Sequence, residues 1–177
     1  MSATKEAVSA EETFAELYEE YMPKVFRYIQ YRVNNMQLTE DLTSTTFEKA
    51  LVSFSKYSSD RAKFSTWIFS IARNVVIDHY RLKGRRMTLP LEEASEVASR
   101  NLPPEEELLK REELERLQIC LTGLSEEEQE IIRLKFGAEL NNRQIAKMLG
   151  LSESNIGTRL YRAVRKLRDS FQESENG

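Results

Sequence analysis

The chain is poor in the side chains that catalysis or metal binding requires. Cys120 is its single cysteine and His79 its single histidine, so the chain can form neither an internal disulfide nor a zinc site of paired Cys and His ligands. A lone cysteine is most simply a small buried apolar residue. The acidic residues fall mainly in expected first turns of helices and in one proline-marked stretch, where capping and solubility explain them. We therefore expect no enzymatic activity, no metal and no cofactor.

Cations are instead gathered in two stretches of the chain. Residues 61–86 hold seven basic residues and one acid, and residues 159–168 hold five basic residues and no acid. Between them, residues 87–118 hold four basic residues and nine acids. Two basic stretches separated by an acidic one indicate two contacts with a polyanion, although solvated helix faces would have the same composition.

Aromatic residues lie among the cations of the first stretch. The aromatics are Tyr57, Phe64, Trp67 and Tyr80, and the cations are Lys56, Arg61, Lys63, Arg73, Arg81, Arg85 and Arg86. Opened DNA exposes base faces and phosphates, and stacking on an aromatic ring contributes roughly 1–3 kcal/mol per base. This mixture is therefore suited to single-stranded DNA, although Phe64 and Trp67 would equally suit a hydrophobic core.

Three polar residues of this stretch share a predicted helix face. Asn74, Asp78 and Arg81 lie at i, i+4 and i+7. They could recognise bases, or Asp78 and Arg81 could form only a surface ion pair. We favour a mixed role in which Asn74 and Arg81 contact DNA.

The most specific local pattern is a helix-turn-helix at residues 142–160. Ala146 supplies the small residue where the two helices cross, and Gly150, four positions later, tolerates the positive φ of the turn. Ser152 would cap the second helix. The apolar positions predicted to hold the motif together are Ile145, Leu149, Leu151, Ile156, Leu160, Val164 and Leu167.

A helix anchored by such a face, with its first turn exposed, can enter a DNA major groove. Polar side chains there reach base edges, and arginines bind phosphate or guanine. An ordinary helical hairpin with a basic face is the alternative. The residues of this motif that we expect to contact DNA are Arg143, Ser152, Ser154, Asn155, Thr158, Arg159 and Arg162.

The remaining periodicity in the N-terminal half predicts helices and no strands. Thr13 with Glu16 would form a capping box that opens a first helix, which Pro23 would break or restart. Thr39 would cap the next helix. Residues 53–65 lack clean periodicity and predict a loop, and a further helix would span residues 66–83.

The C-terminal half continues this pattern. Ser125 with Glu128 is a second capping box, ahead of a helix that Gly137 would end. The fold class is therefore all-α, with two small helical bundles joined by a flexible linker and a helix-turn-helix in the C-terminal one. No run of about 18 apolar residues occurs, and residues 1–12 lack the apolar core of a signal peptide. We expect a cytoplasmic protein without a membrane span.

Two further blocks resemble those of a known family. They are Thr39-Glu-Asp-Leu-Thr-Ser-Thr-Thr-Phe-Glu-Lys-Ala-Leu and Phe64-Ser-Thr-Trp-Ile-Phe-Ser-Ile-Ala-Arg-Asn-Val-Val-Ile-Asp-His-Tyr-Arg. With the helix-turn-helix they follow the order found in the extracytoplasmic-function sigma factors, the smallest members of the bacterial sigma-70 family. The chain resembles that family over residues 14–86 and 114–171.

The resemblance implies three segments and a set of contacts. Residues 12–86 would form sigma domain 2, which binds core polymerase and melts the minus-10 element. Residues 87–112 would form an acidic, proline-containing linker, and residues 113–172 would form sigma domain 4, which reads the minus-35 element. Core polymerase would contact Asp41, Leu42, Thr45 and Phe47. The minus-10 element would contact Lys56, Tyr57, Lys63, Trp67, Arg73, Asn74, Arg81 and Arg85, and the minus-35 element the seven helix-turn-helix residues named above.

The implied partners are core RNA polymerase, promoter DNA and an anti-sigma factor. The DNA would be the minus-35 duplex and the non-template strand of the minus-10 element. The proline-marked linker would let the two domains close around an anti-sigma factor, so we expect the free chain to be a flexible monomer.

The sequence departs from the family pattern at a few positions. Ser44 and Thr45 stand where the family often has glutamine and an acid, and Asn155 stands where threonine is common. Gly157 replaces a common lysine. The glycine either lets the helix backbone approach DNA closely or simply lacks a phosphate-binding side chain.

Two other classes of protein remain as alternatives. A dimeric DNA-binding regulator would need a ligand pocket or a phosphoacceptor in its N-terminal half. A nucleic-acid enzyme would need clustered carboxylates or a nucleophile paired with a base. The sequence shows no sign of any of these features.

Overall fold

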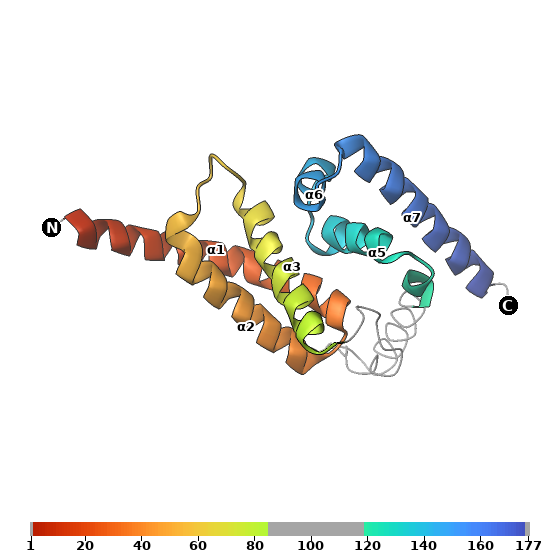
Figure 1. The fold of residues 1–177 in the computed structure, drawn as a ribbon, viewed down its shortest axis with the longest axis horizontal. Coiled ribbons are helices and arrows are strands. Elements are labelled where there is room, and N and C mark those ends of the chain that lie inside the picture. The colour runs from red at the N-terminus through yellow and green to blue at the C-terminus, as the bar shows by residue number, and fades with distance from the viewer. Residues whose placement is uncertain (1, 85–118, 176–177) are drawn as a thin grey trace.

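The fold consists of helices in two groups that pack against each other (Figure 1). The computed structural model describes the backbone of residues 2–84 and 119–175 and the side chains of residues 13–84 and 119–172. The elements are α1 (Ser2–Val33), α2 (Met36–Ser53), the 3-10 turn η1 (Phe54–Lys56), α3 (Phe64–Leu82), α5 (Glu126–Ile132), the π-helical turn η3 (Arg133–Gly137), α6 (Asn142–Leu149) and α7 (Glu153–Glu175). None of the described residues forms a strand, which confirms the all-α fold class. Within these ranges, no helix is long and apolar enough to cross a bilayer.

Helix α1 runs unbroken through Pro23, so the prediction that this proline breaks or restarts a helix was wrong. The helix also begins at Ser2, which places Thr13 inside it rather than at its cap. Proline inside a helix costs about 3 kcal/mol, because it lacks an N–H and clashes with an earlier carbonyl. Phe14 before the proline and Ile29 after it belong to one buried cluster. A continuous helix lets both sides of Pro23 bury apolar surface there, and this packing outweighs the local penalty.

The turn between α1 and α2 uses two consecutive asparagines. Asn34 has a φ of 49°, a left-handed conformation that asparagine tolerates, and its N–H donates to the Gln30 carbonyl at 2.9 Å. Asn35 then caps α2, its side-chain oxygen accepting from the Leu38 N–H at 2.8 Å. Thr39, predicted to be the cap, lies instead one turn inside α2, where its buried hydroxyl donates to the Asn35 carbonyl.

Helices α2 and α3 complete the first group. Helix α3 begins at Phe64, two residues before its predicted start, and the predicted loop contains the short turn η1. The buried residues of α2 recur every three or four positions and are Thr39, Leu42, Thr43, Thr46, Phe47 and Ala50. Those of α3 are Phe64, Thr66, Ile68, Phe69, Ala72, Val75, Val76 and Tyr80.

The helix signals of the second group are confirmed. Ser125 and Glu128 form a capping box at the start of α5. Gly150 has a φ of 68° in the turn between α6 and α7. Ser152 Oγ accepts from the Asn155 N–H at 3.2 Å, as a cap of α7 does.

One position on the apolar face of α7 was predicted wrongly. Val164 is 42% exposed, whereas the neighbouring Ala163 is fully buried against Leu121, Leu124 and Ile132. Because each helical residue turns by about 100°, moving the buried face by one residue exchanges these two side chains. A small residue at position 163 lets α7 lie close to α5. The single cysteine, Cys120, is buried nearby, as predicted.

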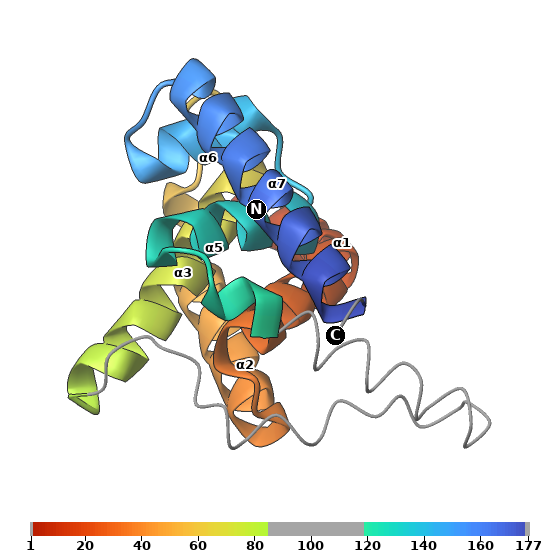
Figure 2. The ribbon, with the colours of Figure 1, turned by 90° about the vertical axis from the view of Figure 1, so that its right-hand side faces the viewer.

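The two groups of helices share one hydrophobic core. A single cluster joins residues of α1, α2 and α3 to Ile131, Leu134, Ile145 and Ile156 of the second group. Turn η3 packs on α1 and helix α6 on α3, and the two views show the second group alongside the first (Figure 1, Figure 2). We call this packing of the two described groups the closed arrangement, and the expectation of a flexible monomer stays a prediction. The predicted linker, residues 87–112, lies outside the described residues.

Candidate nucleic-acid and docking interfaces

Aromatic residues of the predicted minus-10 segment form one cluster between η1 and the start of α3. The Tyr57 ring lies 5.0 Å from that of Trp67 and 5.6 Å from that of Phe64, centroid to centroid. The Tyr57 hydroxyl donates to the Ala62 carbonyl at 3.2 Å and so ties down the loop between them. Phe64 is buried, in agreement with its core interpretation, while Tyr57 and Trp67 are half-buried. The cluster therefore orders the loop and leaves two rings partly accessible.

One face of α3 carries polar side chains in line with Trp67. Trp67, Asn74 and Arg81 are spaced by seven residues, nearly two full helical turns, so they share a face. Asn74 and Arg81 are exposed, and Arg81 pairs with Asp78 at 3.2 Å. An exposed pair of this kind contributes about 0–1 kcal/mol, so Arg81 can exchange it for a phosphate. The other exposed cations predicted for this site are Lys56 and Lys63, and Arg85 lies outside the described residues.

Arg73, also predicted to contact DNA, faces the second group of helices instead. Its Nε lies 3.3 Å from Oε1 of Glu130 on α5. Glu130 also accepts from the Tyr28 hydroxyl at 2.9 Å and forms an ion pair with Arg32. The Arg32 and Glu130 side chains are only 4% and 8% exposed. We call these residues, Tyr28, Arg32, Arg73 and Glu130, the Glu130 network; it joins α1 and α3 to α5.

The charge state of the Glu130 network follows from opposing effects. Burial raises the pKa of the Glu130 carboxyl, but the charge of Arg32 and the hydrogen bonds from Arg32 and Tyr28 outweigh it and leave that pKa below its ordinary value. Burial, together with the negative charge of Glu130, raises the pKa of the Tyr28 hydroxyl. At neutral pH, Glu130 is therefore an ionised acceptor and Tyr28 a protonated donor.

Weaker contacts cross the rim of the same interface. The Arg27 side chain donates to the Gly137 carbonyl at 3.1 Å and pairs with Glu139 at 2.6 Å. Both partners of the Arg27–Glu139 pair are largely exposed, at 41% and 56% of the side chain. The Arg27–Glu139 pair is therefore hydrated, whereas the Arg32–Glu130 pair of the Glu130 network is buried.

Helix α6 covers part of the loop that leads into α3. Lys147 donates to the Arg61 carbonyl at 2.5 Å, and the Gln144 side-chain nitrogen donates to Ser65 Oγ at 2.7 Å. Both α6 residues belong to the helix-turn-helix. In the closed arrangement, part of the predicted minus-35 reader thus lies against part of the predicted minus-10 segment.

Most of the predicted minus-35 contacts face solvent. The exposed ones are Arg143, Ser152, Ser154, Asn155, Thr158 and Arg162. Arg159 differs, because it is half-buried, pairs with Glu127 of α5 and donates from Nε to Asn155 Oδ1 at 2.5 Å. Two turns further on, Lys166 pairs with Glu128 at 2.7 Å, and its hydrogen bond lowers the pKa of that carboxyl. Arg159 and Lys166 thus pair with acidic residues of α5.

Gly157 occupies an ordinary helical position beside the N-terminal end of α6. A Cβ added there would meet only Asn142 Nδ2, at 3.8 Å, which is a normal van der Waals separation. We therefore expect Gly157→Ala to raise the free energy of unfolding by about 0.5–1 kcal/mol and to leave DNA binding unchanged. A thermal melt and a titration with one minus-35 duplex measure the two quantities. Higher melting with clearly weaker binding would show instead that the absent side chain admits DNA.

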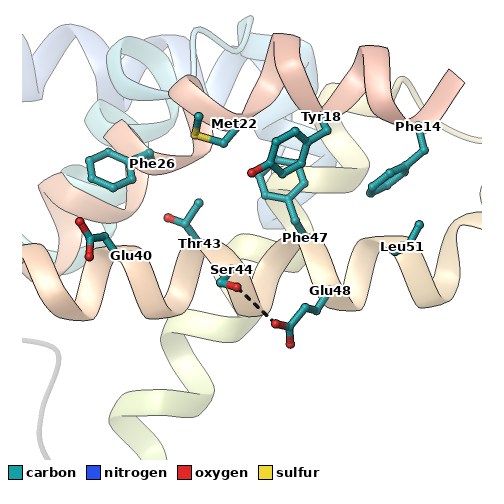
Figure 3. Close-up of a pocket in the computed structure, with 10 residues that line it drawn as sticks. All are labelled: Phe14, Tyr18, Met22, Phe26, Glu40, Thr43, Ser44, Phe47, Glu48 and Leu51. Atoms are coloured by element: carbon teal, nitrogen blue, oxygen red, sulfur yellow. Dashed lines mark hydrogen bonds between the residues drawn. The ribbon is translucent and has the colours of Figure 1, made fainter. Parts of the chain in front are cut away.

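An apolar groove of about 520 Å³ runs between α1 and α2 (Figure 3). Its α1 wall consists of residues spaced by four, Phe14, Tyr18, Met22 and Phe26, and its α2 wall of Glu40, Thr43, Ser44, Phe47, Glu48 and Leu51. Two carboxylates, those of Glu40 and Glu48, are exposed at this surface. Thr43 Oγ1 is buried and neither accepts nor donates a hydrogen bond among the described residues. The groove can thus take an apolar segment that also carries a cation or a hydrogen-bonding group.

Of the residues predicted to bind core polymerase, only Phe47 lines this groove. Leu42 is buried on the opposite side of α2, in the core. Asp41 is exposed and Thr45 half-buried, and the Thr45 hydroxyl donates to the Asp41 carbonyl at 2.9 Å. The α1 wall was missed as a docking surface, although its four-residue apolar spacing was visible in the sequence.

Comparison with known families accounts for both groups of helices. Residues 17–86 match the model of Sigma-70 region 2, and residues 114–167 match that of Sigma-70 region 4. The first range holds the α3 face and all of the groove residues except Phe14, and the second holds the helix-turn-helix. The class that these regions define is a sigma factor of RNA polymerase.

Individual relatives narrow the class. The chain is 33% identical over 156 residues to the ECF RNA polymerase sigma factor BldN of Streptomyces coelicolor, covering 88% of this chain and 59% of that protein. It is 28% identical over 166 residues to the ECF RNA polymerase sigma factor SigX of Bacillus subtilis, covering 92% of this chain and 85% of that protein. The fold is similar to that of the sigma factor RpoE from Bartonella quintana, solved in complex with the anti-sigma factor NepR, with a TM-score of 0.70 and 19% identity over 91% of this chain and 98% of that chain. The chain belongs to the extracytoplasmic-function sigma factors.

Proposed function

We propose that this protein directs core RNA polymerase to a specific set of promoters and helps to open their minus-10 element. The observation that carries the proposal is that one chain has two different surfaces suited to binding DNA. The α3 face offers accessible rings and cations, as single strands require, and the helix-turn-helix offers polar groups on an exposed helix start, as a duplex requires. The protein acts as an initiation factor without catalysis of its own, in the cytoplasm.

The non-template strand of the minus-10 element binds along α3 in this proposal. Tyr57 and Trp67 offer stacking surfaces, and Asn74 and Arg81 continue the same line. Phosphates are bound by the cations Lys56, Lys63, Arg73 and Arg85. Arg73 joins this set only when it leaves Glu130, because its side chain is otherwise committed to the closed arrangement.

Core polymerase docks in the groove between α1 and α2. The groove is apolar, with a buried hydroxyl that has no described partner and carboxylates at its edge, so a partner there can bury apolar area and add polar contacts. Phe47 contributes to this surface from within the groove, and Asp41 and Thr45 from the adjoining face of α2. Leu42 supports the surface from the core.

An anti-sigma factor that occupies the same groove would hold the protein inactive. The groove needs no rearrangement to accept such a partner, because its walls come from α1 and α2 alone. The similar fold of RpoE, which was solved in complex with the anti-sigma factor NepR, supports this kind of control for the present chain.

Run-off transcription with purified core polymerase on genomic fragments tests the proposal. Adding the protein should yield specific transcripts without any ATP-driven activator, and the protein should co-purify with core polymerase at moderate salt. Footprinting without polymerase separates this function from that of a dimeric regulator, which would protect its site alone. Failure to bind core polymerase would exclude a sigma factor role.

A further inference from the structure

Asn155 and Arg159 form the only described hydrogen bond between side chains on the DNA-facing start of α7. Arg159 Nε donates to Asn155 Oδ1 at 2.5 Å. Arginine has donors and no acceptor, so the amide atom that faces it must be the oxygen. The Asn155 NH₂ group is therefore turned away from Arg159, and Asn155 itself is exposed.

Arg159 is itself fixed from outside the helix-turn-helix. Its Nη1 pairs with Glu127, the second residue of α5, while Nε remains on Asn155. The next residue of α5, Glu128, receives Lys166 at 2.7 and 2.9 Å and also closes the Ser125 capping box. The first turn of α5 thus contacts α7 through two ion pairs, Arg159–Glu127 and Lys166–Glu128. Arg159 must leave Glu127 before it can turn toward DNA.

We propose that Glu127 is a specificity-determining positioning residue, which acts through Arg159 to present Asn155 to DNA as a hydrogen-bond donor. Asparagine recognises adenine with both its oxygen and its nitrogen, accepting from N6 and donating to N7. The hydrogen bond from Arg159 occupies one lone pair of the Asn155 oxygen and fixes the orientation of the amide, so Asn155 presents its NH₂ group as the free donor. In the major groove, N7 of adenine, N7 and O6 of guanine and O4 of thymine accept hydrogen bonds, whereas cytosine presents only its N4 donor. Asn155 is therefore set to favour a base that presents an acceptor at the position that it contacts and to disfavour cytosine.

The inference rests on the proposed function, because it assumes that α7 reads the minus-35 element. Its test is selection from duplexes with a randomised minus-35 element by holoenzyme, reconstituted from core polymerase and the full chain. The wild-type chain, Glu127→Gln and Glu126→Gln are compared. Glu126 is the matched control, since it lies in the same turn of α5 and forms no ion pair with a described residue.

We expect wild type and Glu126→Gln to disfavour cytosine at one position. In Glu127→Gln, the Asn155 amide is no longer fixed and can turn its oxygen to N4 of cytosine. The ratio of the accepting bases to cytosine at that position should then fall by roughly fivefold or more, the lower end of what one base contact contributes. The other minus-35 positions and the melting temperature should change little, because the Glu127 side chain is 61% exposed.

Three outcomes would overturn the inference. An unchanged preference in Glu127→Gln would show that Asn155 needs no positioning. An equal loss in both variants would show that only the charge of the first turn matters. A wild-type holoenzyme that selects no minus-35 sequence at all would contradict the proposed function, and the inference with it, and is distinguished by the failure of every variant alike.

Discussion

Replacing Glu130 by alanine should separate the two groups of helices. The substitution leaves Arg32, 4% exposed, and the neighbouring Arg73 without their carboxylate in the closed arrangement. Removing one partner of a buried ion pair costs about 3–5 kcal/mol. Opening the interface relieves this cost, because both guanidinium groups then return to water. Small-angle scattering should show a radius of gyration several Å above the roughly 16 Å expected of a compact chain of this length, with helicity by circular dichroism preserved.

The exposed pair at the rim of the interface supplies the control. Glu139→Ala removes the partner of Arg27, whose side chain is 41% exposed, and should change stability by about 0–1 kcal/mol without opening the chain.

Acid should open the wild-type chain as the Glu130→Ala substitution does. Because the pKa of Glu130 is lower in the closed arrangement than in water, its contribution is complete above the ordinary value of 4.5 and is lost as the pH falls below it. An unchanged radius of gyration in Glu130→Ala would mean that apolar contacts alone hold the interface.

Placing an arginine in the groove should weaken binding to core polymerase by roughly tenfold or more, because an added charge must be desolvated on docking. Ser44→Arg does this at an exposed site on the α2 wall. The new side chain can pair with Glu48 one turn later, so the helix itself is preserved. Fluorescence anisotropy of the labelled chain, titrated with core polymerase, measures the dissociation constant.

Val52→Arg is the matched control for the groove. Val52 is 84% exposed, lies on the same helix and does not line the groove. Its replacement adds the same charge and should leave the dissociation constant within about twofold, as expected for a surface position outside the interface. Equal binding by the Ser44→Arg chain would show that core polymerase docks elsewhere.

Local signals predicted much of the fold. Ser125, Gly150 and Ser152 do what their residue types favour, because caps and left-handed turns depend on the nearest few residues. Pro23 shows the limit of such signals. Its penalty is local, but the burial that outweighs it depends on α2 and α3, which no short window of sequence contains.

The candidate sites were predicted unevenly for the same reason. The exposed start of α7 follows from helical periodicity, whereas the partners of Arg73 and Arg159 lie on α5, far away in the sequence. Glu130 was the largest omission. An acidic residue in a short helix ordinarily suggests solvation, and its burial becomes apparent only once Tyr28 and Arg32 are brought against it.

The closed arrangement affects the apparent affinity of one candidate binding surface and not that of the other. The groove lies on α1 and α2, and no residue of it hydrogen-bonds or pairs across the interface among the described residues. A partner that touches only the groove binds closed and open chains equally, so it leaves their populations unchanged. A ligand that needs Arg73 binds only the open population, and its apparent affinity falls in proportion to the open fraction, tenfold for every 1.4 kcal/mol that favours closure. If DNA binds at α3 as proposed, closure of the interface therefore weakens DNA binding there, whereas it leaves the affinity of a partner in the groove unchanged.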